Sequence, residues 1–267
     1  MKRGRKVKIA RFEEMKWKEI EEMDKKKSIV FLPMGSLEEH GPHLPVGTDL
    51  FIAEEIVKEV AKLVKKEKLN PVLLPSIPVA PCSVTFDFPG TLSVDAKCIE
   101  NMVYNISKSL ALHDFKYLVI CTYHMDPFFI KAIHKAIRKA QAKFDIRIAE
   151  PGSSFFYGKG DEDLHAGEQE TSIMLYLYPH LVDPSYKSLS NFSFSFSIKD
   201  FRKTLRELGA INGYVGFPSK ASIERGKELF EKIVYFYFEN TLKLYNGEYS
   251  LSTPKFIKYL PLILQRR

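Results

Sequence analysis

The residues best suited to chemistry lie in one segment rich in Gly and Pro, PMGSLEEHGPHLPVGTD, which holds Glu38, Glu39, His40, His43 and Asp49. Carboxylate and imidazole groups are the ligands that zinc, manganese or iron binds in proteins. Alternate side chains of an extended loop point the same way, so Glu38 and His40 can face one point, and Asp49 can reach back from the next helix. The segment therefore predicts half of a two-metal hydrolytic site. The alternative is a solvated acidic loop in which Asp49 caps a helix.

Two later clusters carry the same residue types. In CTYHMDP, His124 directly follows an apolar run and Asp126 lies two residues further on. In DEDLHAGEQETS, His165, Glu168 and Glu170 precede an apolar helical run. Each cluster also has a structural explanation, because a histidine after a strand is often a core or turn residue and acids before a helix often cap it. On residue type alone, each cluster is either part of the site or structural.

Short strands and amphipathic helices alternate around these clusters. The predicted strands are residues 28–32, 72–74, 117–122 and 146–148, and the predicted helices are residues 51–67, 94–112, 128–143, 168–178 and 222–244. Such alternation is typical of an α/β fold with a mostly parallel sheet. Ligands of such sheets bind beyond the carboxyl ends of the strands, where both His40 and His124 fall. A Phe-Ser stretch at residues 191–197 is a half-buried strand or an ordered loop.

Composition limits the class of protein. The 267 residues are 45% hydrophobic, and no repeat or low-complexity linker divides them, so we expect a single domain over residues 1–267. The formal net charge is +7, but the Lys residues are spread over amphipathic faces and no nucleic-acid motif is present, so we expect no nucleic-acid partner. Three cysteines without a pairing motif indicate a reducing compartment. No signal peptide or membrane span is visible, so we expect a cytoplasmic protein without membrane contact.

The segment GSLEEHGPHLPVGTD resembles the signature of the creatininase family, in which a Gly-Ser-x-Glu-Gln-His-Gly-Pro-His-Leu-Pro pattern is followed by Asp. The resemblance continues in FPGTLSV, HAGEQETSIML and GYVGFPSKASIERGKEL, in the family's order, and so covers most of the chain. It implies a three-layer α/β/α sandwich with a mostly parallel central sheet. It also implies two divalent metal ions per chain (Zn, Mn or Fe) and a homo-oligomer, often a hexamer in this family.

Residue by residue, the resemblance assigns the metal ligands. Glu38 and His40 match ligands of separate metals, Asp49 matches the carboxylate that bridges them, and His124 completes the protein ligands of the first metal. Asp126 stands where creatinine-hydrolysing members have a Glu ligand to the second metal, although many members have Gly there.

The resemblance also implies the groups that act on substrate. Glu170 matches either a metal ligand or a base for metal-bound water, and His165 matches a proton donor to the leaving nitrogen. We expect His43, Ser83 and Tyr123 to contact substrate.

Three departures from the family bear on the substrate. The chain has TYHMDP where most members have an Asn-Gly-His-Gly-Gly-Asn run, and Glu39 where they have Gln. The Glu-His pair that precedes FPGT in the family is also absent, since residues 84–86 are VTF. The leading hypothesis is a metal-dependent amidohydrolase that cleaves a non-peptide C–N bond, in a cyclic amide or a formamide, of a small molecule.

Other hypotheses remain open. A formamide on a phosphorylated substrate would suit this basic chain, with Lys159, Lys220 and Arg225 near the motifs, although solvated roles are more common for such residues. The same chemistry can open a ring in a cyclic ketone-like sugar. A catalytically altered metal-binding or scaffold member of the family is the alternative from a different class.

Overall fold

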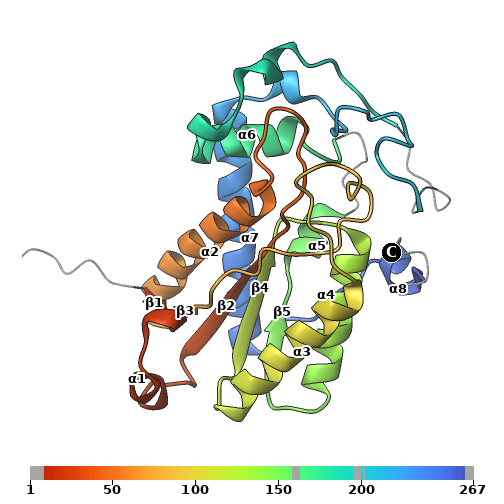
Figure 1. Ribbon diagram of the computed structural model, residues 1–267. Helices are drawn as coiled ribbons and strands as arrows, with labels where there is room; N and C mark the ends of the chain where they lie inside the picture. Colours follow the sequence, from red (N-terminus) through yellow and green to blue (C-terminus); the bar gives the residue numbers. More distant parts are fainter. Residues whose placement is uncertain (1–8, 158–162, 195–199, 201, 262–267) are drawn as a thin grey trace, which may run out of the picture.

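Five parallel strands form the centre of the molecule. The computed structural model describes residues 9–157, 163–194, 200 and 202–261 (Figure 1). The strands are β1 (Ala10–Arg11), β2 (Ser28–Met34), β3 (Asn70–Leu73), β4 (Tyr117–Thr122) and β5 (Arg147–Ala149). Their order across the sheet is β1-β3-β2-β4-β5, and every neighbouring pair is parallel. The central strand β2 is buried along its whole length, as a parallel strand covered on both faces must be.

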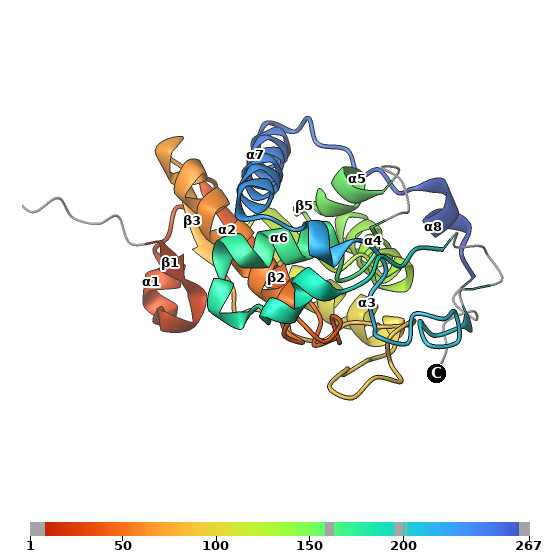
Figure 2. The same cartoon turned by 90° about the horizontal axis from the view of Figure 1, so that it is seen from above.

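Helices cover both faces of this sheet. The longer helices are α2 (Thr48–Lys66), α3 (Ala96–Leu112), α4 (Pro127–Gln141), α6 (Glu168–Leu177) and α7 (Ile223–Asn246). Ile29 and Phe31 of β2 pack in one hydrophobic cluster with residues of α2 and α7, whereas Val30 and Leu32 pack in a second cluster with residues of α3 and α4. Figures 1 and 2 show these helix pairs on opposite sides of the sheet. The predicted three-layer α/β/α sandwich is therefore confirmed.

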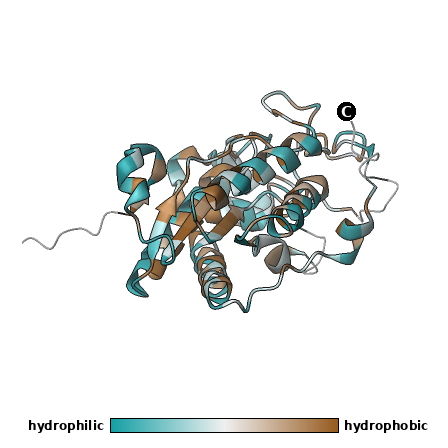
Figure 3. Cartoon of the chain, turned by 90° about the horizontal axis from the view of Figure 1, so that it is seen from below, coloured by the Kyte–Doolittle hydropathy of each residue, from teal (hydrophilic) through white to brown (hydrophobic). Residues whose placement is uncertain are grey.

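Helix and strand surfaces differ in polarity as this layering requires. Figure 3 shows apolar strands in the interior and helices that carry polar residues on the sides away from them. In α2, Ile52, Ile56 and Val60 are buried while Lys62 and Lys66 are exposed. No helix of the described residues is long and apolar enough to cross a membrane.

Several short elements complete the fold. They are the helices α1 (Trp17–Glu21), α5 (Gly152–Phe156) and α8 (Lys255–Tyr259), with 3-10 turns η1 (Phe12–Glu14), η2 (Pro179–Leu181), η3 (Pro184–Ser188) and η5 (Pro218–Lys220). Sequence periodicity predicts none of these, because an element of three to five residues has no measurable period. The Phe-Ser stretch at residues 191–197 lies partly outside the described residues, and within it Phe192 forms a single antiparallel bridge to Gly216.

The loops that follow β2 and β4 lie at the same edge of the sheet, because the strands are parallel and adjacent. Helix α6 lies beyond this edge in Figure 1. The segments that carry the predicted site residues therefore meet here.

Candidate metal centre

The loop after β2 is held against the first turn of α2. A Cβ at Gly35 would lie 2.6 Å from Leu50 Cα, so only glycine allows this close approach. The approach brings Asp49 next to the loop, where Ser36 Oγ donates a hydrogen bond to Asp49 Oδ2 at 2.7 Å. The N-cap of α2 is Gly47, and Asp49 lies inside the first helical turn with its side chain buried. Asp49 therefore faces the site and does not cap the helix.

His124 faces two carboxylates with one ring nitrogen. Its Nε2–H donates to the carbonyl of Pro81 at 2.7 Å, which leaves Nδ1 directed at Glu38 Oε2 and Asp49 Oδ2, each 3.0 Å away. A backbone carbonyl that fixes the far nitrogen of a histidine is the usual support for a metal-ligating ring. Burial lowers the pKa of His124, but the two carboxylates outweigh it and the pKa is raised well above its ordinary value.

His40 has the same arrangement with its nitrogens exchanged. Its Nδ1–H donates to the carbonyl of Glu38 at 2.9 Å, and its buried Nε2 has no hydrogen-bond partner. That nitrogen lies 3.5 Å from Asp49 Oδ1 and 3.8 Å from Glu170 Oε2. An unpartnered buried nitrogen opposite two carboxylates is costly unless a cation lies between them.

The acids of the site are perturbed in a consistent way. Burial would raise the pKa of Asp49, but His40 and His124 outweigh it and the pKa is held well below its ordinary value. The pKa of Glu38 is lowered to about 2, because His124 more than offsets burial. The pKa of Glu170 is raised, chiefly by burial. Clusters of this kind are common at catalytic sites.

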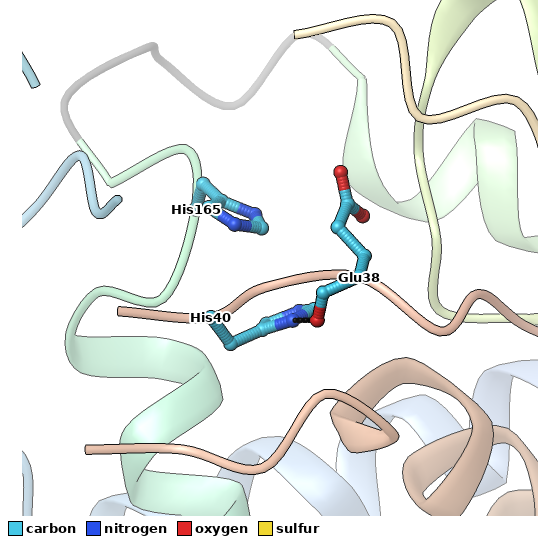
Figure 4. A group of neighbouring side chains, drawn as sticks. All are labelled: Glu38, His40 and His165. Carbon is cyan, nitrogen blue, oxygen red and sulfur yellow. Dashed lines mark hydrogen bonds between the residues drawn. The ribbon is translucent and has the colours of Figure 1, made fainter. Parts of the chain in front are cut away.

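Three overlapping groups of side chains have the composition and closeness of metal ligands. Within each group, one candidate ligand atom per residue lies within 4.8 Å of the others. The groups found among the described residues are Glu38 with His40 and His165, Glu38 with Cys82 and His124, and His40 with Asp49 and Glu170. Figure 4 shows the first group, in which Glu38 and His40 come from one loop and His165 from the segment leading into α6. Mixed His and carboxylate ligands fit divalent zinc, manganese or iron, and the overlap places two candidate cation positions side by side.

In the structure Asp126 caps a helix, whereas the resemblance implies that it binds a metal. Asp126 is the N-cap of α4, where its Oδ1 accepts from the backbone N–H groups of Phe128 at 2.8 Å and Phe129 at 3.1 Å. Its Oδ2 accepts from the N–H of Ser83 at 3.0 Å. Asp126 lies in none of the three groups. Metal ligation by Asp126 stays a prediction, against which three backbone donors compete.

His165 is held by the backbone next to the ligands. Its Nε2–H donates to the carbonyl of Glu39 at 2.8 Å, and the Glu39 side-chain Oε1 lies 3.4 Å from the same nitrogen. Burial lowers the pKa of His165, but Glu39 and the other nearby carboxylates outweigh it and raise the pKa to about 10. Its ring centre lies 4.5 Å from that of His40. The ring is thus placed beside the candidate cation positions.

The three residues expected to contact substrate are all buried. His43 Nε2 is hydrogen-bonded to the Thr171 hydroxyl at 2.8 Å, and its Nδ1 has no partner. Burial lowers the pKa of His43 to about 4. The Ser83 hydroxyl is also buried without a partner, and Tyr123 packs edge-on against Phe156. The unpartnered polar atoms of His43 and Ser83 fit substrate contact, which stays a prediction.

Sequence reasoning missed some members of the site. Cys82 shares a candidate group with Glu38 and His124, and the Thr85 hydroxyl donates a hydrogen bond to Glu38 Oε1. Ser36, noted above, also lies in the family-like segment, but nothing in its residue type marks it as a support for Asp49. The run that carries Cys82 and Thr85 lies just before FPGT, where the chain departs from the family and offers no motif to follow.

The residues considered for phosphate binding give that role little support. Lys159 lies outside the described residues. Lys220 lies over the ring of Phe217, 4.3 Å from its centre, and Arg225 Nε lies 3.8 Å from a Glu168 carboxylate oxygen.

Comparison with known proteins agrees with the resemblance. The creatininase family model, described as creatinine amidohydrolase, matches residues 13–239. The chain is 27% identical over 213 residues to a mycofactocin precursor peptide peptidase of Mycobacterium ulcerans, across 77% of this chain and 81% of the relative. It is 29% identical over 195 residues to a creatinine amidohydrolase of Pseudomonas putida, across 64% and 72%. A 3-dehydro-scyllo-inosose hydrolase of Thermotoga maritima is 25% identical over 185 residues, across 64% and 57%.

Solved structures share the fold. A mutant creatininase complexed with creatine superposes with a TM-score of 0.71 at 26% identity, covering 89% of this chain and 99% of that one. A mutant creatininase of the Zn-Zn type and a structure described as creatininase Mn each superpose with a TM-score of 0.68, at 26% and 25% identity. They cover 87% of this chain and 96% and 97% of their own. The relatives hydrolyse different compounds, so likeness alone does not select a substrate.

Proposed function

Because this chain belongs to the creatininase family, whose members are hydrolases of carbon–nitrogen bonds, we propose that it hydrolyses a non-peptide C–N bond in a small molecule at a site for two divalent metal ions. The substrate class is a cyclic amide or a formamide. The observation that carries the proposal is the buried, unpartnered Nε2 of His40, which faces Asp49 and Glu170 while the other oxygen of Asp49 faces His124. Asp49 is thus the acid shared by two candidate cation positions.

The ligand sets follow from these contacts. One ion would be held by Glu38, Asp49 and His124, and the other by His40, Asp49 and Glu170. Two divalent ions so placed would lower the pKa of a water and polarise the carbonyl of the substrate. The hydrogen bonds of His40 and His124 to backbone carbonyls direct the other ring nitrogen of each histidine toward the site before any ion binds.

The proton movements fall to two of the chain's own groups. Glu170 accepts the N–H of Ala166 at 2.5 Å, which fixes its carboxylate; as the alternative to holding the second ion, it would accept the proton of the attacking water, a role that its raised pKa suits. His165 is held by the Glu39 carbonyl, and Glu39 and the nearby carboxylates raise its pKa, so it is the group that would give a proton to the leaving nitrogen. Both groups lie against His40, which places them on the same side of the site.

The test begins with metal content. Elemental mass spectrometry of the purified protein should give about two divalent ions per chain. Asp49→Ala should lose most of both, because Asp49 serves both positions, whereas the matched control Asp95→Ala, an exposed acid outside the site, should keep them. Protein that is metal-free and cannot be reloaded would overturn the proposal and favour a scaffold role.

The second step is product analysis with the metal-loaded protein and a panel of cyclic amides, formamides, short peptides and cyclic ketone-like sugars. The proposal expects release of an amine, ammonia or formate, or ring opening of a cyclic amide, lost in Asp49→Ala. Turnover of sugars alone, without a nitrogen product, would move the assignment to a ring-opening hydrolase like the Thermotoga maritima relative. Turnover of peptides alone would move it toward the peptidase relatives.

A further inference from the structure

Cys82 lies among the candidate ligands of one metal position. Its side chain is fully buried, and its Sγ, a Glu38 oxygen and a His124 nitrogen all lie within 4.8 Å of one another. Its neighbours anchor it there, since the Pro81 carbonyl accepts from His124 and the Ser83 N–H donates to Asp126. The backbone on both sides of the thiol is therefore tied to the loop that follows β4.

We infer that Cys82 is a ligand of the metal ion held by Glu38 and His124, so that this position binds zinc or another sulfur-seeking ion in preference to manganese. The inference rests on the proposed two-metal function. Thiolate ligands favour softer ions, whereas carboxylate and water ligands suit manganese. Glu38, His124 and Cys82, with Asp49 shared between the two ions, would give ligands of the types that zinc binds.

Asp126, an acid on the loop after β4, is engaged elsewhere. Asp126 accepts three backbone hydrogen bonds and shares no candidate group with Glu38 and His124. The thiol has no strong competing partner outside the group, because its hydrogen bond to the Ala80 carbonyl spans 3.5 Å and its other interaction is with His124 itself. Of Asp126 and Cys82, the thiol is therefore the side chain available to join Glu38 and His124. On binding the ion the thiol loses its proton to solvent, and a sulfur–metal bond forms.

The chain's other cysteines provide an internal comparison. Cys121 is equally buried on β4 and has a similar weak bond, to the Ala53 carbonyl at 3.6 Å, but it belongs to no candidate ligand group. Cys98 is exposed on α3. Burial and weak hydrogen bonding thus do not distinguish Cys82, and its position beside Glu38 and His124 does.

The experiment uses Co²⁺ alone as the probe. Metal-stripped protein is loaded with Co²⁺, its metal content is measured, and its near-ultraviolet spectrum is examined for sulfur-to-cobalt charge transfer. The variant C98S/C121S, which leaves Cys82 as the sole cysteine, should keep the band of the wild type. Cys82→Ser should bind cobalt without the band and should lose about 10- to 100-fold in zinc affinity, with manganese affinity changed far less.

The outcomes separate this inference from the function on which it rests. Cobalt bound at about two ions per chain without a sulfur band, in both wild type and C98S/C121S, would overturn the role of Cys82 and leave the two-metal hydrolase intact. No cobalt bound by any variant would overturn the proposed function itself. Because the wild-type and C98S/C121S spectra decide the matter, the test does not depend on Cys82→Ser folding.

Discussion

Asp126 is either the N-cap of α4 or a metal ligand, and substitution of Asp126 distinguishes the two roles. In the structure, its oxygens accept two N–H groups at the start of α4 and one from Ser83. Removal of an N-cap costs about 0.5–2 kcal/mol, and a buried N–H left without an acceptor costs about 1–3 kcal/mol. Asp126→Ala should therefore reduce the free energy of unfolding by about 2–4 kcal/mol. At this chain length the midpoint of thermal unfolding should fall by about 4–8 °C.

Asp126→Asn should destabilise less, because asparagine is about as good a cap as aspartate and only one oxygen is replaced. Calorimetry measures the midpoints, and elemental analysis measures the metal. If Asp126 serves as a cap, both variants keep about two ions per chain. Ser222→Ala is the matched control, since Ser222 caps α7 through the N–H of Arg225 at 3.1 Å. It should lose about 1 kcal/mol and no metal.

A folded Asp126→Asn protein that has lost one ion, with its unfolding midpoint nearly unchanged, would refute this reasoning. That result would restore Asp126 as the ligand of the second metal that the creatininase resemblance implies.

Three further predictions concern the neighbours of the ligands. A Cβ at Gly213, where φ is +73°, would lie 2.0 Å from Glu39 Oε2, so Gly213→Ala should lower kcat/KM by up to about 100-fold in steady-state assays. Gly209→Ala has a similar φ of +92° and no contact nearer than 3.5 Å, so it should show only backbone strain of about 1–2 kcal/mol and normal turnover. Glu39→Gln removes a group that raises the pKa of His165, so the pH at which activity is lost on the alkaline side should fall. An unchanged pH–rate profile would show that His165 is not the proton donor. Stripping the metal with a chelator should lower the unfolding midpoint, and reloading should restore it; equal midpoints would argue against ions bound to the native state.

Much of the fold follows from the sequence because its main elements are long or continuous. The apolar run at residues 117–122 coincides with β4 (Tyr117–Thr122), and the periodic run at residues 51–67 lies within two or three residues of the bounds of α2 (Thr48–Lys66). Strand β1 (Ala10–Arg11) has only two residues and exists because it pairs with β3, which is a tertiary effect. No local pattern could predict it.

The candidate site was predicted to the extent that its residues adjoin such elements. His40 and His124 follow neighbouring parallel strands, so the meeting of their loops follows from topology. Cys82 lies in a loop without periodicity, whose path is fixed by a bridge between Ala80 and Ser93 that only the structure reveals. The capping role of Asp126 could be predicted from the sequence, because an Asp followed by Pro at the first helical position marks the start of a helix. The family pattern directed attention to its ligand role instead.

The charge balance of the site explains why its residues belong together. Glu38, Asp49 and Glu170 are buried beside one another, and such a group of carboxylates is unfavourable in a low dielectric unless positive charge is supplied. His40 and His124 supply it only when protonated, and each has its remaining nitrogen committed to a backbone carbonyl. Two divalent cations would meet the same need while leaving both histidines neutral, with their lone pairs directed at the ions. The raised pKa values of these histidines thus reflect the positive charge that the carboxylates require, and divalent ions would supply that charge in a form that can also activate water.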